Sequence, residues 1–201
     1  MAITKLSDSS ITTGDKYISM LAGNSAYVPP PYESIATTTV GAGGQANVEF
    51  TSISNAFTHL QIRYIARTSR VATAEDIDLQ LNSDTANNYS WHIIYGDGAN
   101  PVTATGVSTY RMIVPGVASA NATANFFGAG VIDILDYTST NKFKTVRSLG
   151  GNDRISAGEI MFESGSWRST SAVTSLKLTP SAGSNFVQYS VFALYGIRGS
   201  L

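Results

Sequence analysis

The feature of this sequence that most constrains its fold is the frequent interruption of short apolar runs by clusters of Gly, Asn, Asp, Ser and Pro. Such clusters lie at residues 41–44, 82–88, 96–101, 150–153 and 180–185. The apolar runs themselves are short and suit β-strands, which average about 5–6 residues, better than helices of about 11–12. Because these segments follow one another with no convincing helical period, we predict an all-β fold, an antiparallel jelly-roll-like β-sandwich.

Alternation of apolar and polar residues supports the strand assignment. Leu60, Ile62 and Tyr64 share one parity while Gln61 and Arg63 share the other, as a half-buried strand requires. We predict strands at residues 34–40, 46–50, 60–68, 77–81, 90–95, 110–114, 129–137, 143–148, 159–164, 175–178 and 191–196.

The N-terminal residues differ from the rest of the chain. Residues 1–31 carry small polar side chains and end in three consecutive prolines at 29–31, which cannot pair within a central strand. We therefore predict an extended anchoring arm at 1–31 and a sandwich domain at 32–201; a frayed terminus without a role is the alternative. No apolar run at the start resembles a signal peptide and none reaches the ~18 residues of a spanning helix, so we expect synthesis in the cytoplasm and no membrane insertion.

Charge is scarce in this chain. Charged residues make up 13% of it, with 13 basic and 14 acidic side chains, whereas soluble domains average about 25%. Without a basic excess we expect no nucleic-acid partner. The 43% of hydrophobic residues argues against disorder. The absence of cysteine excludes disulfides, Cys-ligated zinc and a Cys nucleophile.

Residues that could carry catalysis are few. The histidines are His59 and His92, too few for a His-based zinc site without recruited carboxylates. Among the carboxylates, Asp76 and Asp78 share a strand face, but same-face spacing is also typical of surface residues. Asp133 and Asp136 would point to opposite faces of an extended strand. We predict no catalytic residues, no cofactor and no enzyme.

Calcium is an open alternative. Asp76, Asp78 and the Asx-rich segment 82–88 concentrate oxygen ligands, but they lack the spacing of an EF-hand loop. Asx turns explain the same residues without a metal, so we predict no metal site and leave calcium as the alternative.

Aromatic residues beside polar loops are the best candidates for ligand binding, because they offer apolar area at little entropic cost. Alternation would place Trp91 on the same face as Ile93, which favours a core position for it instead. The binding candidates are Trp91, His92, Tyr95, Asp97, Trp167 and Arg168.

Several segments together resemble a module of virion structural proteins of tailed bacteriophages, including tail-fibre and head-decoration proteins. These segments are residues 32–40, 57–63, 81–89, 133–137, 144–151 and 192–197, and residues 3–14 are similar to the N-termini of such fibre proteins. The resemblance implies a jelly-roll-like β-sandwich assembled as a homotrimer and located in the virion.

Three functions follow as expectations. The first is a non-enzymatic tail-fibre or spike component whose arm binds other virion proteins. The second is a capsid decoration protein, and the third is a carbohydrate-binding module that recognises host surface polysaccharide. A hydrolase is disfavoured by the missing catalytic constellation. The lack of thiols suits a protein made in one redox compartment and used in another, and low charge lets copies pack without strong repulsion.

Overall fold

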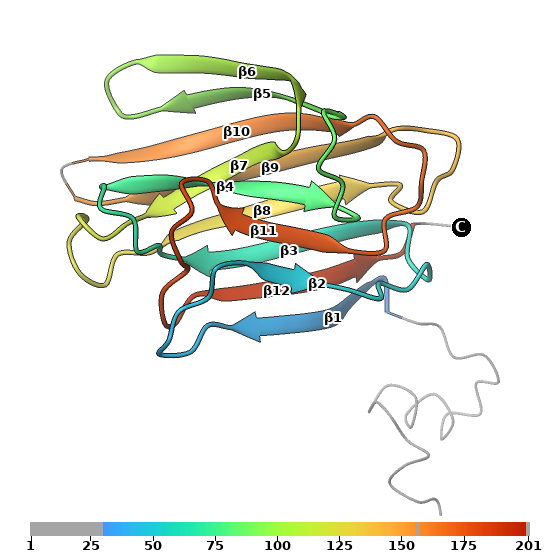
Figure 1. Cartoon of the computed structure of the whole chain (residues 1–201), viewed down its shortest axis with the longest axis horizontal. Coiled ribbons are helices and arrows are strands. Elements are labelled where there is room, and N and C mark those ends of the chain that lie inside the picture. The colour runs from blue at the N-terminus through green and yellow to red at the C-terminus, as the bar shows by residue number, and fades with distance from the viewer. Residues whose placement is uncertain (1–29, 156, 200–201) are drawn as a thin grey trace, which may run out of the picture. The chain divides into compact units, whose positions relative to one another are not determined.

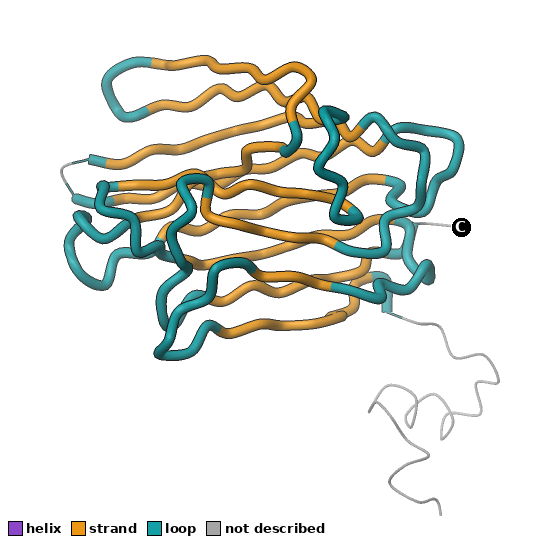
Figure 2. The backbone as a smooth tube through the Cα atoms, in the orientation of Figure 1, coloured by secondary structure: helices purple, strands orange, loops and turns teal. Residues whose placement is uncertain are grey.

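The computed structural model describes residues 30–155 and 157–199, and its contacts divide the chain into Met1–Pro31 and Tyr32–Leu201. The second unit is described below (Figures 1 and 2). Except for Pro30 and Pro31, the predicted arm lies outside the described residues, so its anchoring role stays a prediction.

Two antiparallel sheets form this unit. In the described residues the strands are β1 (Tyr32–Thr39), β2 (Val48–Phe50), β3 (His59–Ala66), β4 (Ala74–Leu81), β5 (Tyr89–Gly96), β6 (Pro101–Thr109), β7 (Met112–Ala118), β8 (Gly128–Leu135), β9 (Lys144–Asp153), β10 (Gly158–Trp167), β11 (Leu176–Pro180) and β12 (Val191–Ile197). An eight-stranded sheet has the order β1-β12-β3-β8-β9-β10-β5-β6, and a four-stranded sheet has the order β2-β11-β4-β7. Figure 1 shows the two sheets as stacked layers, with β6 at the edge beyond β5.

The predicted all-β sandwich is confirmed. Its jelly-roll-like character is not, because the described strands divide eight and four, whereas a jelly roll is built from eight strands in two Greek keys. No helix occurs among the described residues, so none there is long and apolar enough to cross a membrane.

The strand missing from the prediction is β6. Its sequence PVTATGVST has no large aromatic or Leu/Ile side chain, and six of its nine residues are exposed. An edge strand with little to bury carries only a weak alternation signal. Opposite it, the ring of Trp91 fills the space at Gly106: a Cβ there would lie 2.4 Å from the indole.

Strand β7 is longer than predicted because it contains a bulge. Val114 pairs with Ile77 and Val117 pairs with Glu75. Between these two pairs β7 has two residues, Pro115 and Gly116, where β4 has one. A bulge relieves proline of the ladder hydrogen bond that it cannot donate.

The core lies between the two sheets, and a side-chain hydrogen bond connects one sheet to the other across it. Tyr64 is buried on β3, stacks on Phe192 at 5.8 Å, and donates its hydroxyl to the carbonyl of Pro115 on β7 at 2.6 Å. Its cross-strand neighbour is Gly130, where a Cβ would lie 2.3 Å from the Tyr64 hydroxyl. The glycine therefore makes room for the tyrosine that links the sheets.

Replacing this hydroxyl tests the link between the sheets. Tyr64→Phe keeps the ring but leaves the Pro115 carbonyl without its donor, and we expect the free energy of unfolding to fall by about 1–3 kcal/mol. Denaturant unfolding measures the change. Tyr195→Phe on the opposite face of the same sheet is the control and should change stability little; equal losses in both variants would contradict the role given to Tyr64.

Candidate functional site

The six residues predicted to bind a ligand do not form one site. Trp91 on β5 is half-buried against the core. Trp167, at the end of β10, is 3% exposed, stacks on Tyr89 at 6.4 Å and donates its indole N–H to Asp84 Oδ2 at 2.7 Å. The two tryptophans thus face the inner side of the sheet, as alternation suggested for Trp91.

The other four candidates are dispersed around these strands. His92 is exposed on the outer face of β5, and Tyr95 lies on the inner parity. Asp97 accepts hydrogen bonds from the backbone N–H groups of residues 99 and 100 in the β5–β6 turn. Arg168 donates to the carbonyl of residue 87 and to Ser108. Asp97 and Arg168 therefore stabilise loops at opposite ends of β5, and carbohydrate binding by this set stays a prediction.

The oxygens considered for calcium are engaged in turns. Asp84 accepts from Trp167, Asn88 and the N–H of residue 86. Asn82 Oδ1 accepts from the N–H groups of residues 174 and 175. Within the described residues, no group of three or more His, Cys, Asp and Glu side chains could hold a metal ion.

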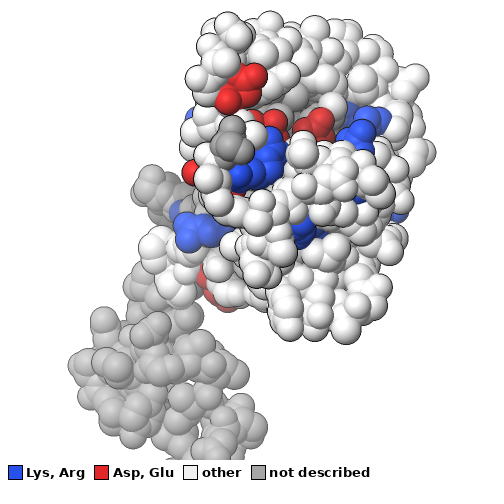
Figure 3. Space-filling model, turned by 90° about the vertical axis from the view of Figure 1, so that its left-hand side faces the viewer, with Lys and Arg blue, Asp and Glu red and all other residues white. Residues whose placement is uncertain are grey.

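The carboxylates on β4 are held by neighbouring side chains. Asp78 forms an ion pair with Arg111 at 2.6 Å and accepts a hydrogen bond from Ser181. Burial and the nearby charge of Glu159 raise the pKa of Asp76 to about 6. On the face drawn in Figure 3, several acidic and basic side chains lie close to one another, and most of the remaining surface is uncharged.

Asp76 and Glu159 come close enough to deserve comparison with a catalytic pair. A Cβ on Gly116 would lie 3.0 Å from Asp76 Oδ1 and 3.3 Å from Glu159 Oε1, so both carboxylates flank the β7 bulge. Glycosidases present two such carboxyls to one sugar bond. Here Glu159 borders an open hollow of about 880 Å³ whose lining does not include Asp76, and its Oε1 accepts a hydrogen bond from the Asn152 side chain at 2.9 Å.

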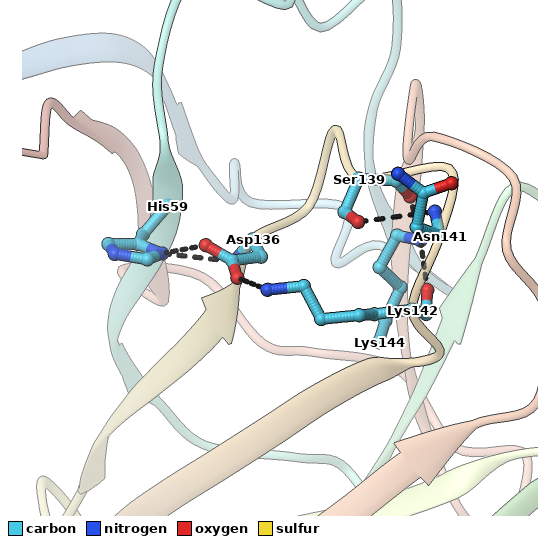
Figure 4. A network of polar contacts seen from close by, with 6 residues as sticks. All are labelled: His59, Asp136, Ser139, Asn141, Lys142 and Lys144. Carbon is cyan, nitrogen blue, oxygen red and sulfur yellow. Dashed lines mark hydrogen bonds and ion pairs between the residues drawn. The ribbon is translucent and has the colours of Figure 1, made fainter.

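A second group of polar side chains holds the β8–β9 turn (Figure 4). The backbone N–H of Asp136, which has a φ of 48°, donates to His59 Nδ1 at 2.9 Å, and Lys142 pairs with the Asp136 carboxylate. Buried Lys144 donates to the carbonyls of Ser139 and Lys142 at 2.6 and 3.1 Å. These hydrogen bonds and this ion pair hold the loop between β8 and β9. Strand β8 therefore ends at Leu135, two residues before the predicted end at 137.

The most distinctive carboxyl is inside the sandwich. Glu163 on β10 is fully buried and accepts a hydrogen bond from Ser148 on β9. Its Oε1 has no hydrogen-bond partner among the described residues. Burial raises the pKa of Glu163 to about 8, and the Ser148 hydrogen bond opposes part of that rise. Because this carboxyl is shielded from solvent, we assign Glu163 no contact with a substrate.

The outer face of the eight-stranded sheet holds a different kind of candidate. The registers align one polar row across this face. Its members are Ser34, Tyr195, Gln61, Asp133, Arg147, Ser164, His92 and Thr105. Two further rows lie beside it and are largely apolar. One contains Arg63, Val131, Leu149, Phe162 and Ile94, and the other contains Val191, Ile65, Ala129, Gly151 and Ile160. We call these two rows the apolar outer face.

Large side chains of the apolar outer face are open to solvent. Ile65, Leu149, Phe162 and Ile94 are 49–51% exposed and Ile160 is 64% exposed. The face ends in a hollow of about 490 Å³ between these side chains and the β5–β6 turn. An antiparallel sheet normally turns polar residues to water on its free face, and a contiguous apolar patch marks an interaction surface. This arrangement is suited to binding a partner.

Alternation alone did not reveal this face. On β10, Ile160 and Phe162 point outward while Met161 and Glu163 point inward, so both parities carry apolar side chains. The feature of the sequence that could have indicated the apolar outer face is the presence of apolar side chains on both sides of β10, which is typical of a strand covered on both faces.

Comparisons with protein-family models, with curated protein sequences and with solved structures found no match.

The buried carboxyl predicts how stability depends on pH. The folded chain keeps the Glu163 proton between pH 4.5, the ordinary pKa, and about 8, where the unfolded chain has lost it. The free energy of unfolding must therefore fall as the pH rises through this window, by at most about 1.4 kcal/mol per pH unit for this group. Asp76 adds a similar fall that ends near its pKa of about 6.

Glu163→Gln should flatten the pH dependence above pH 6, because a neutral amide replaces the titrating carboxyl. Denaturant unfolding at several pH values between 5 and 9 measures it. Glu49→Gln, at an exposed position on β2, is the control. A slope unchanged by Glu163→Gln would contradict the raised pKa.

Proposed function

We propose that this chain is a non-enzymatic structural protein of a bacteriophage virion, a tail-fibre or spike component displayed on the particle as a homotrimer. The observation that carries the proposal is the apolar outer face. A surface of this kind is costly for a protein that works alone, because about 25 cal/mol is lost for each Å² of apolar area left in water. It suits a building block that is covered on assembly.

The remaining features are consistent with a structural role. The sequence segments that resemble virion modules extend from residue 32 to residue 197 and supply strands and turns rather than a catalytic motif. The titratable side chains near possible sites cap turns or form ion pairs, as Asp84 and Asp78 do. A capsid decoration protein, capping neighbouring subunits, is an alternative location in the same particle.

A carbohydrate-binding role is the second candidate and is favoured by one cluster on the outer face. Tyr32 and Tyr195 stack at 4.9 Å, and the Arg63 guanidinium lies 5.2 and 5.5 Å from their ring centroids. Gln61 accepts from the Tyr32 hydroxyl and donates to Asp133. Tyrosine rings beside planar polar groups are suited to sugar recognition, so glycan-array binding by the full chain, lost in Tyr195→Ala, would support this role.

Deleting residues 1–31 tests the structural proposal. The sandwich domain contains its own core, so we expect the shortened protein to fold but to be left out of particles assembled in infected cells. Purified particles are analysed by mass spectrometry for the chain. Circular dichroism of the shortened protein provides the control for folding, and its normal incorporation would refute anchoring through the arm.

A further inference from the structure

We propose that the apolar outer face is the surface through which copies of this chain bind one another. The assignment rests on the proposed function as a particle building block and adds the identity of the interface and of its occupant. Ile94, Leu149 and Phe162 form one continuous row across β5, β9 and β10. Ile160 lies beside this row, in the adjacent one, and makes a contiguous exposed apolar patch with it. Ile65 lies further along that adjacent row, separated from Ile160 by Ala129 and Gly151.

The apolar outer face and the polar row beside it are together large enough for a stable interface. Eight strands about 4.8 Å apart, with outward rows about 6.8 Å apart, give roughly 500 Å² for the two apolar rows and roughly 800 Å² when the polar row is included. A standard protein–protein interface buries about 800 Å² on each partner. Burial of the central apolar rows would remove large side chains from water, which is the main source of association free energy.

The charges on the apolar outer face and on the polar row beside it favour a copy of the chain as the occupant. Arg63, Asp133 and Arg147 lie on outward rows, and Asp133 on β8 lies opposite Arg147 on β9 in the strand register. Because both signs are present, two copies of the face can be placed with acidic groups opposite basic ones. A partner of one charge sign, such as nucleic acid or an anionic surface, would gain from one sign and meet repulsion from the other.

The apolar outer face also has a hollow into which a side chain of a second copy can fit. The hollow of about 490 Å³ is lined by Ile94, Leu149, Ile160, Phe162 and Pro101, among others. Ile160 is 64% exposed at its margin. In a homotrimer the contacts between copies are heterologous, so the hollow of one copy meets a different part of the next copy's outer face and can accept an apolar side chain from it.

A matched pair of substitutions tests the assignment in the full chain. Phe162 is 51% exposed on the apolar outer face, and Phe143 is 54% exposed in the loop before β9. We expect multi-angle light scattering at micromolar concentrations to give a multiple of the 21.3 kDa chain mass for the natural protein and for Phe143→Glu. Phe162→Glu should raise the dissociation constant by roughly 30-fold or more, as expected for a charge at an interface centre. Circular dichroism verifies that both variants fold.

Thiol labelling gives an independent readout because the chain has no cysteine. A maleimide should react with Phe162→Cys more slowly as protein concentration rises, while Phe143→Cys reacts at a constant rate. A monomer with a reactive Phe162→Cys thiol overturns the proposal, as does an oligomer that Phe162→Glu leaves intact. A monomer with a protected thiol also overturns it, because the face is then covered without a second copy.

These outcomes are separable from the proposed function. A natural chain that does not self-associate but is incorporated into particles would overturn the interface and the homotrimer and leave the virion role standing. Self-association with no incorporation into particles would leave the interface and overturn the virion role.

Discussion

A sheet in water needs a layer over each apolar face, and this constraint governs the rest of the structure. The four-stranded sheet covers the inner face of the eight-stranded one, and the Tyr64 hydroxyl joins them at the β7 bulge. The opposite face has no layer within the described residues, although Leu149 and Phe162 lie at its centre. The sandwich therefore has a complete core, but the apolar outer face of its larger sheet is left in contact with water.

Most of the architecture could be predicted from local pattern. Turn clusters and alternation identified an all-β sandwich, and β3 lies within a residue or two of the predicted 60–68. The limits of prediction have physical causes. Strand β6 buries too little to produce a pattern, and Pro115 looked like a strand end because the bulge that accommodates it depends on pairing with β4.

The interaction surface was harder to predict than the fold. Phe162 and Ile94 look like core residues in sequence, and Glu163 looks like a surface residue, yet the structure reverses these positions. Which parity of a two-sided apolar strand faces inward depends on the covering sheet, which single-strand periodicity does not contain. The aromatic candidates failed to converge for a related reason: Trp167 and Trp91 were needed for packing at the inner side of β5 and β10.

The electrostatics support an architectural role for the scarce charges. Lys144 holds carbonyls of a turn, Asp84 orders the loop before β5, and Glu163 is kept inside as a neutral acid near pH 7 by its burial. The most direct test of the central claim is a cryo-electron microscopy map of the assembled protein at side-chain resolution. The account predicts that Leu149 and Phe162 of one copy contact the apolar outer face of another. A map in which this face is open to solvent, while the copies meet through other surfaces, would contradict it.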